Sequence, residues 1–412
     1  MKVDLTYGTG QLTVDIPSGT KVDFYEPGRS SNPVESHGFL VQARKEGLSD
    51  FLAEDTPLII VNDANRNTPT ARLLGWLKVG YPDLLEKAGF LVACGTHAPP
   101  TEPQLQKIFG EHLETVRPRV AFHDARNQDS MTMIGEDRYG GSVYVDTLLH
   151  KARRTLVLTS SEPHYFAGFT GGRKSILPGL SDIATIERNH NMANSLAAAP
   201  LKLKGNPVAE HMGEVAQMAG AHGIFSVQVV LDAAGEIAGA FFGPLDDAFA
   251  KAVDAAEGLY AKSVTEPYDV VLCEVRSPFD RSLYQVQKAL ENSQTAVADG
   301  GADILVSACS EGIGPDRFFK LADEWDREKN EHQEGKTVFG SHKLSRVNGI
   351  SRRIEVLLHS GLPDETVRKV FYEPMADVDK FLKQKANGRP GLRRMAVVHD
   401  ASNTVLTMAT NK

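Results

Sequence analysis

Short, continuous apolar runs alternate with longer amphipathic stretches along the first two thirds of the chain. A continuous apolar run is typical of a strand that is buried on both faces of a sheet. Helices are predicted between these runs over residues 71–88, where Pro82 must interrupt the helix, and 101–114. This alternation predicts an α/β domain with a mainly parallel sheet. The predicted strands are 57–61, 90–93, 120–122, 155–158 and 225–231.

A second α/β pattern begins near residue 266. Its predicted strands are 269–273, 302–306 and 395–399, with a helix over 282–298 and a solvated, charged helix over 323–336. We therefore expect two α/β domains with mainly parallel sheets, residues 1–265 and 266–412. A cleft between two such domains is the default place for an active site.

Composition narrows the class of protein. The 412 residues carry a formal net charge of −8, which argues against nucleic-acid binding. No apolar run is long enough to span a membrane, and the first residues resemble a strand rather than a secretory signal. The odd number of cysteines, Cys94, Cys273 and Cys309, is typical of reduced thiols, so we expect a cytoplasmic protein. Cys94 lies close to His97, and a catalytic thiol there stays open.

The segment 162–179 holds the strongest candidate chemistry, because it follows a predicted strand and contains four glycines. Glycines let backbone N–H groups approach an anion, His164 can move protons, and Lys174 can contact phosphate or act as a nucleophile. The segment is not a P-loop, since Arg173 stands where the last glycine of that motif belongs. The alternative is a surface loop with incidental glycines, which such a composition disfavours.

Polar residues also follow two other predicted strands. Asp63 and Arg66 come after one strand and His97 after the next, and loops at the carboxyl ends of parallel strands converge at one edge. An arginine there suits a bidentate grip on a carboxylate or phosphate. His123 has a similar position without a glycine turn and is a weaker candidate. In the second block, Gln285 and Lys288 share a helix face, where an amide and an ammonium can hold a carboxylate.

Together these segments resemble the nickel-dependent lactate racemase family, which includes other 2-hydroxyacid racemases and epimerases. The family pattern has an Asp-x-x-Arg-x-x-Pro strand end, a Gly-Thr-His turn, a His…Gly-Gly-x-Lys…Pro-Gly loop, a later histidine and a Gln-x-x-Lys helix. Here it is matched, in the same order, by Asp63, Arg66 and Pro69; Gly95, Thr96 and His97; His164, Gly171, Gly172, Lys174, Pro178 and Gly179; His190; and Gln285 with Lys288.

The resemblance implies a cofactor, a nickel ion held in a pincer formed by a pyridinium mononucleotide with thioamide and thiocarboxylate groups. The nucleotide would be joined covalently to Lys174, with His190 as a nickel ligand. Gly171, Gly172 and Asp63 would contact this cofactor. Its synthesis needs other proteins, which are therefore expected maturation partners. The resemblance leaves open whether the chain forms a homo-oligomer.

The resemblance also implies a reaction. A 2-hydroxyacid would lose its α-hydrogen as hydride, giving a 2-ketoacid whose other face then takes the hydride back. His97 and His164 would be the two bases for the hydroxyl proton, one for each enantiomer. Arg66, Gln285 and Lys288 would hold the substrate carboxylate, and Phe166 and Tyr284 would line a small apolar pocket.

The sequence departs from the family pattern at two places. Ala64 and Asn65 follow Asp63 where a hydrophobic residue and threonine are expected, and Ala98 follows His97 where an arginine is expected. These departures put a different 2-hydroxyacid beside lactate as the expected substrate, and the apolar pocket of Phe166 and Tyr284 favours a short one. Two other functions stay open, namely a zinc hydrolase that uses His97, His164 and His190, and a non-catalytic nucleotide-binding protein.

Overall fold

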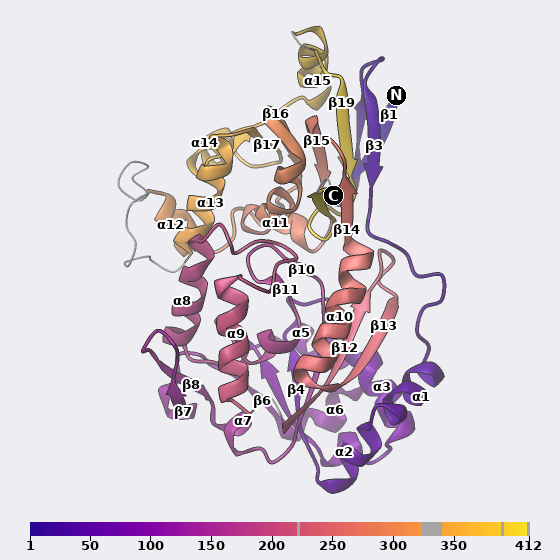
Figure 1. The fold of residues 1–412 in the computed structure, drawn as a ribbon, viewed down its shortest axis with the longest axis vertical. Coiled ribbons are helices and arrows are strands. Elements are labelled where there is room, and N and C mark those ends of the chain that lie inside the picture. The colour runs from indigo at the N-terminus through magenta and orange to yellow at the C-terminus, as the bar shows by residue number, and fades with distance from the viewer. Residues whose placement is uncertain (221–222, 324–339, 389–390, 410–412) are drawn as a thin grey trace. The chain divides into compact units, whose positions relative to one another are not determined.

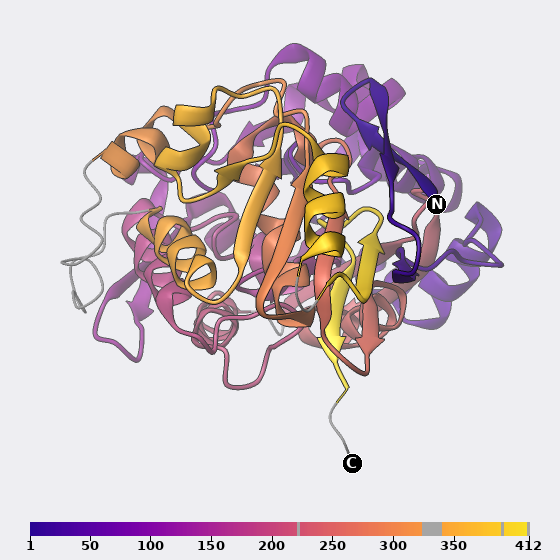
Figure 2. The ribbon, with the colours of Figure 1, turned by 90° about the horizontal axis from the view of Figure 1, so that it is seen from above.

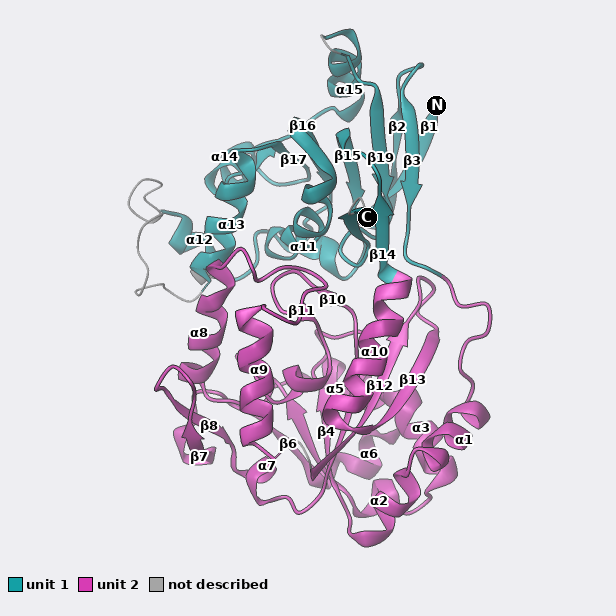
Figure 3. Ribbon diagram, viewed as in Figure 1, with its two compact units in different colours: residues 1–28, 260–412 teal, residues 29–259 magenta. Residues whose placement is uncertain are grey.

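The computed structural model describes residues 1–220, 223–323, 340–388 and 391–409. The chain forms two units, one of residues 29–259 and one that joins residues 1–28 to residues 260–412 (Figures 1 and 3). Each unit is built around one six-stranded sheet with helices, so the predicted α/β class with mainly parallel sheets is confirmed.

In the unit of residues 29–259, the strands follow the order β13-β12-β9-β4-β5-β6. All neighbours are parallel except β13, which lies antiparallel to β12 at the edge. The five predicted strands are all present, and β9 and β12 are buried along their whole length, as their continuous apolar runs require. The bounds are β4 Leu58–Asn62, β5 Gly89–Ala93, β6 Val120–Phe122, β9 Thr155–Ser160, β12 Ile224–Leu231 and β13 Ile237–Pro244.

Six helices share one hydrophobic core with this sheet. The predicted helix over residues 71–88 is divided into α3 and α4, because Pro82 cannot continue the first helix. A capping box of Thr101 and Gln104 starts α5. The six helices are α1 Ser36–Lys45, α2 Leu48–Glu54, α3 Thr70–Gly80, α4 Leu84–Lys87, α5 Glu102–Phe109 and α6 Leu113–Val116.

The rest of this unit surrounds the glycine-rich segment. A 3-10 turn, η4 (Gly172–Ser175), contacts β4, β9 and α9. Short strands β10 and β11 precede it and pair antiparallel. The bounds are β7 Met131–Glu136, β8 Ser142–Asp146, α7 Thr147–Lys151, β10 Pro163–His164, β11 Gly168–Phe169, α8 Ile183–Asn191, α9 Pro207–Met218 and α10 Leu245–Tyr260.

In the other unit the sheet is parallel throughout, in the order β18-β17-β16-β15-β19-β3. Helices α11 to α14 pack on one face, and the hairpin β1–β2 packs with α15 on the other. Figure 2 shows α15 (yellow) in front of these strands.

The strands of this unit are β1 Lys2–Tyr7, β2 Gly10–Asp15, β3 Lys21–Tyr25, β15 Tyr268–Glu274, β16 Val297–Val306, β17 Glu355–His359, β18 Glu373–Pro374 and β19 Arg394–Val398. A separate parallel pair is formed by β14 Ala261–Val264 and β20 Val405–Met408. The helices are α11 Leu283–Ser293, α12 Asp316–Asp323, α13 Ser341–Ser351, α14 Asp364–Lys369 and α15 Val378–Asn387.

The division of the chain differs from the predicted one at the amino terminus. Residues 1–28 belong with residues 260–412, because β3 pairs in parallel with β19 and the β1–β2 hairpin buries its apolar side chains against the same sheet. The break before Tyr260 lies close to the predicted boundary at residue 265. The predicted cleft between the domains stays a prediction.

One predicted helix is shorter in the structure, and another lies almost entirely outside the described residues. The helix predicted over 282–298 ends at Ser293, and β16 already begins at Val297. Apart from Asp323, the charged helix predicted over 323–336 lies outside the described residues. In the described part of the chain, no helix is long and apolar enough to cross a membrane.

Candidate active site

Three predicted site segments converge because β9, β4 and β5 are adjacent and parallel. Their carboxyl ends therefore meet at one edge of the sheet, which is where open parallel sheets bind ligands. Asp63 follows β4, His97 follows β5, and His164 follows β9. The turn before His97 packs directly on the glycine-rich segment, since the Gly95 N–H donates to the Gly179 carbonyl at 3.0 Å.

Asp63 and His97 form a hydrogen-bonded pair. Nδ1 of His97 lies 2.6 Å from Oδ2 of Asp63, and the Asp63 carboxylate also accepts from the side chain and backbone of Asn65. Burial by itself raises the pKa of Asp63, but the bond to His97 and the charges of His97 and Arg66 outweigh it, and the pKa is lowered. An ionised Asp63 requires the hydrogen on Nδ1 of His97. Nε2 of this half-exposed ring is then the atom that can accept a proton.

His164 is held by its own loop. It is 7% exposed, and the Ala167 N–H donates to its Nδ1 at 3.3 Å. A neutral ring in this arrangement carries its hydrogen on Nε2. The two predicted bases are therefore oriented by different groups, His97 by a carboxylate and His164 by a backbone amide.

The ring of Phe166 lies among three predicted site residues. Its centre is 4.6 Å from the His164 ring, 5.2 Å from the His190 ring and 5.8 Å from Nζ of Lys174. Phe166 is 3% exposed, so its ring is packed in place among its neighbours. The predicted base, the predicted metal ligand and the predicted attachment lysine thus surround one buried aromatic side chain.

His190 is electrostatically suited to remain neutral. Burial, followed by the positive charges of Lys174, Arg66 and His97, lowers its pKa to about 3, against a weaker opposing hydrogen bond to the Ile186 carbonyl. A neutral imidazole is the form that binds a transition metal. The charges of Lys174, Arg66 and His97 show that residues from three other segments act on this ring.

The glycine-rich segment is fixed by buried polar contacts. The fully buried Gln228 on β12 accepts from the Gly172 N–H at 3.1 Å and from the Ser161 hydroxyl at 3.2 Å. Gly171 has φ +82°, and a Cβ there would collide with Ser161 and Gln228. Gly172 has φ +47°, and a Cβ there would enter the Phe249 ring. Neither position admits a side chain without movement.

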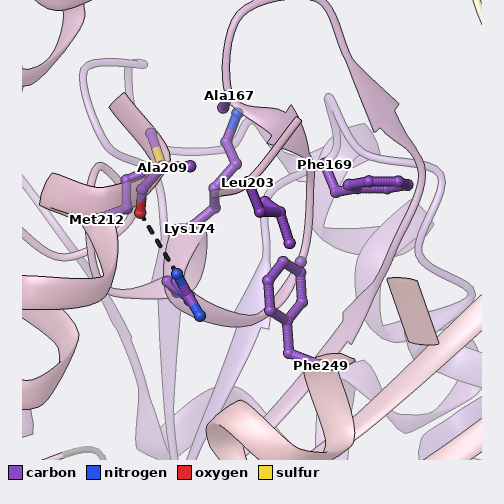
Figure 4. Close-up of a pocket in the computed structure, with 9 residues that line it drawn as sticks. Ala167, Phe169, Lys174, Leu203, Ala209, Met212 and Phe249 are labelled. Atoms are coloured by element: carbon purple, nitrogen blue, oxygen red, sulfur yellow. Dashed lines mark hydrogen bonds between the residues drawn. The ribbon is translucent and has the colours of Figure 1, made fainter. Parts of the chain in front are cut away.

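A pocket adjoins Lys174 (Figure 4). The lysine side chain extends past Leu203 toward Ala167 (Figure 4). The neighbouring Arg173 donates to the Ala209 carbonyl at 3.5 Å. The other lining residues are mostly apolar, namely Phe169, Gly171, Met212 and Phe249. An amine at the wall of an apolar pocket suits a covalent attachment point.

Arg66 follows Asp63 in the same loop, and its backbone N–H donates to the Asp63 carbonyl at 3.2 Å. Among the described residues its guanidinium makes no hydrogen bond or ion pair. A partly buried guanidinium with open donors suits an anionic ligand.

The predicted residues Tyr284, Gln285 and Lys288 lie on α11 of the other unit. Tyr284 stacks edge-on against Phe318 at 5.3 Å, and Nζ of Lys288 lies 3.9 Å from the centre of the Phe279 ring. Burial raises the pKa of Tyr284 to about 12, so it stays a neutral phenol. Their role as substrate contacts stays a prediction.

Two weaker candidates have structural roles. Cys94 is buried, and burial together with the charge of Asp63 raises its pKa to about 12, which leaves an unreactive thiol. His123 is fully buried between Asp146, 3.0 Å from Nδ1, and the Ser181 carbonyl, 3.0 Å from Nε2.

Gln228 and Lys343 were not among the predicted site residues, and Asn65 was named only as a departure from the family pattern. Gln228 could have been found, because it is a polar residue inside an otherwise apolar predicted strand. Lys343 is buried, donates to the Tyr284 carbonyl at 2.8 Å and lies 3.8 Å from the centre of the Tyr284 ring. Its partner is 59 residues away, so no local spacing signals it.

The residues present suit a covalently attached nucleotide with one protein ligand to its metal. Ser175, next to Lys174, is 1% exposed, and its hydroxyl has no hydrogen-bond partner in the described part of the chain. Such an orphaned group indicates a missing contact. Among the described residues, no group of three or more His, Cys, Asp or Glu side chains is arranged to hold a metal ion. His97, His164 and His190 therefore do not form the ligand set that a zinc hydrolase needs.

Known proteins resemble the chain over most of its length. The family model of the lactate racemase N-terminal domain matches residues 7–199, and that of the lactate racemase C-terminal domain matches residues 265–399. A lactate racemase from Thermoanaerobacterium thermosaccharolyticum is 28% identical over 346 residues, covering 81% of this chain and 79% of the relative. One from Lactiplantibacillus plantarum is 30% identical over 273 residues, covering 65% and 63%.

Two solved structures share the fold. The lactate racemase apoprotein from Thermoanaerobacterium thermosaccharolyticum matches with a TM-score of 0.85 at 24% identity, over 99% of this chain and all of that one. A crystal structure of a protein from Thermotoga maritima matches with a TM-score of 0.69 at 16% identity, over 92% of this chain and all of that one.

Proposed function

The chain belongs to the lactate racemase family and is an isomerase, and from this premise we propose that it interconverts the enantiomers of lactate or a related short 2-hydroxyacid. The proposal includes a nickel-pincer nucleotide attached to Lys174, with His190 as the nickel ligand. The observation that carries it is the grouping of His164, His190 and Lys174 around the buried Phe166 ring.

The reacting carbon of a 2-hydroxyacid carries a hydrogen that is a poor acid. When bound, the cofactor would supply a reversible hydride acceptor, so that the substrate passes through a 2-ketoacid and no carbanion forms. Lys174 would hold the cofactor in place through its amine, and His190 would present a neutral imidazole to the metal.

The protein's own residues manage the hydroxyl proton. Nε2 of His97 can accept it, since Asp63 holds the hydrogen of that ring on Nδ1. His164 is proposed to serve the opposite enantiomer. The proton count balances when one ring takes the hydroxyl proton and the other, in its protonated form, returns a proton to the ketoacid oxygen, and for His164 this requires the Ala167 N–H to leave Nδ1. Arg66, with its open donors, would bind the carboxylate. Gln285 and Lys288 are proposed to share that task, and Phe166 and Tyr284 to line the apolar part of the pocket.

The direct test is the intact mass of protein produced with nickel and the cofactor-synthesis proteins, followed by peptide mapping. We expect an adduct of mononucleotide size on Lys174. Lys174→Ala should abolish it, and the matched control Lys78→Ala, at an exposed lysine of α3, should retain it. An unmodified Lys174, under conditions that modify a known lactate racemase in parallel, would overturn the proposal.

The hydride step has its own test. Lactate that carries deuterium on carbon 2, racemised by the loaded enzyme in ordinary water, should keep its deuterium in both enantiomers. Exchange of the label with solvent, measured by mass spectrometry, would show that the hydrogen leaves as a proton and would rule out this mechanism.

A further inference from the structure

A buried polar cluster meets the last turn of α8, the turn that carries His190. It joins three elements of the same unit, with Asp137 from the β7–β8 turn, Arg188 and Asn189 from α8, and His211 from α9. None of these four residues belongs to the predicted site. Arg188 and Asn189 immediately precede His190, so whatever holds them also fixes the rotation of the helix at that ring.

Asp137 is the centre of the cluster. Its side chain is fully buried and accepts four hydrogen bonds, from the backbone N–H groups of Tyr139 and Gly141 at 3.0 Å each, from Nε of Arg188 at 2.6 Å and from Nε2 of His211 at 3.0 Å. Burial raises its pKa, but these hydrogen bonds outweigh it and the pKa is lowered. Asp137 is therefore an ionised carboxylate in which each oxygen accepts two hydrogen bonds.

His211 connects Asp137 to Asn189, the residue of α8 that follows Arg188. Since Nε2 donates to Asp137, Nδ1 is the acceptor, and Nδ2 of Asn189 lies 3.3 Å from it. The same amide donates to the Val208 carbonyl of α9 at 3.0 Å. His211 and Asn189 are both fully buried. The hydrogen bonds from Asp137 through His211 to Asn189 therefore fix the orientation of both side chains.

The remaining contacts leave little freedom for the helix end. Nη2 of Arg188 donates to the Ser142 carbonyl at 2.9 Å, and a side chain at Gly141 would collide with the Arg188 guanidinium. A buried ion pair adds little stability compared with an apolar replacement of similar volume. The Asp137–Arg188 ion pair instead provides a defined geometry, because it fixes the direction in which His190 leaves the helix.

We propose that Asp137 and His211 are positioning residues for His190, fixing the last turn of α8 so that its imidazole is presented to the metal beside Lys174. The inference rests on the proposed function, in which His190 binds nickel. Groups hydrogen-bonded directly to a metal ligand commonly change metal affinity by about 10- to 100-fold when removed. Asp137 and His211 act through Arg188 and Asn189 rather than on the His190 ring itself, so we expect an effect at the lower end of that range.

The test measures nickel loss from the loaded enzyme, in addition to activity. Asp137→Asn and His211→Ala are produced with nickel and the cofactor-synthesis proteins, and the release of nickel to a chelator is timed. We expect both variants to keep the adduct on Lys174 and to lose nickel about 10-fold faster than the wild type. His211→Gln, whose amide can replace both ring contacts, should restore much of the retention.

The matched control is Leu77→Ala, a cavity in the core of the same unit that lowers stability without touching α8. It should release nickel at the wild-type rate despite a lower melting temperature. If the Asp137 and His211 variants release nickel no faster than Leu77→Ala, the positioning role is wrong. If the wild type gains no adduct, the proposed function fails, and this inference fails with it.

Discussion

Asp63 sets the state of His97, because its carboxylate lies 2.6 Å from Nδ1 of that ring. Asp63→Asn keeps an acceptor for the Nδ1 hydrogen and removes the negative charge that stabilises the protonated ring. A hydrogen bond to a charged group contributes about 1.5–3 kcal/mol. We therefore expect kcat to fall about 10- to 100-fold with either lactate enantiomer.

The same variant separates two roles of Asp63. If Asp63 acts through His97, Asp63→Asn should still carry the full adduct on Lys174 in an intact mass spectrum. An adduct that is lost together with activity would instead support the cofactor contact that the sequence predicted. Asp124→Asn, at an exposed carboxylate that follows β6, is the control and should change neither quantity.

At this scale the sequence singles out candidate reactive groups but not their partners. His97, His164, Lys174 and His190 stand out because histidine and lysine beside glycines at strand ends have few other uses. The contact of Asp63 with His97 spans 34 residues, and that of Gln228 with Gly172 spans 56. Such contacts depend on which strands are neighbours, and local spacing does not show this.

The glycine-rich segment is the element on which the site depends most. Gly171→Ala would place a methyl group against Ser161 and Gln228 in a backbone conformation with φ +82°. Strain of this kind costs about 1–3 kcal/mol. We expect the free energy of unfolding, measured in urea, to fall by about this amount, and the extent of the Lys174 adduct to fall with it.

Gly38→Ala is the comparison for this prediction. Gly38 lies in α1, and an added Cβ there meets no atom within 4 Å. It should raise the free energy of unfolding by about 0.4–1 kcal/mol and leave the adduct unchanged. Equal stability of Gly171→Ala and the wild type would show that the loop can move to admit a side chain.

Helices and strands were predicted best where a single local sequence feature determines them. Continuous apolar runs identified all five parallel strands of the first sheet, and Pro82 divided a helix where expected. The end of α11 was missed, because it depends on tertiary contacts. Ser293 donates to the Ala289 carbonyl at 2.8 Å and lies 2.6 Å from Asp303 on β16, and apolar periodicity shows neither.

For the whole molecule, Asp303 links stability to pH. Burial raises its pKa from 3.8 to about 7, against weaker opposing bonds from Ser293 and Cys273. The protonated carboxyl therefore contributes stability that is fully present below about pH 4 and is lost as pH rises to about 7. Each pH unit in this interval corresponds to about 1.4 kcal/mol, so the loss is on the order of 4 kcal/mol.

Asp303→Asn should remove this dependence, because an amide keeps hydrogen bonds and does not titrate. We expect the variant to be more stable than the wild type at pH 8 and similar to it at pH 4, as measured by urea unfolding at a series of pH values. If the stability difference between the two proteins does not change between pH 4 and pH 8, Asp303 does not titrate in this interval.

At this scale the sequence predicted two α/β domains but assigned residues 1–28 to the wrong one. The pairing of β3 with β19 joins residues more than 370 positions apart, such as Lys21 and Arg394. A short strand carries no sign of a partner that distant, and proximity in sequence favours the nearer domain.

That pairing also determines the order in which the protein can be completed during synthesis. Residues 29–259 leave the ribosome as one continuous unit, with every strand of their sheet available. The first 28 residues must wait for the second sheet: the apolar side of their hairpin stays uncovered until β15 and its neighbours emerge, and β3 has no partner until β19 emerges. A nascent chain arrested before residue 268 should therefore hold one folded unit and an amino-terminal segment that is still accessible to protease.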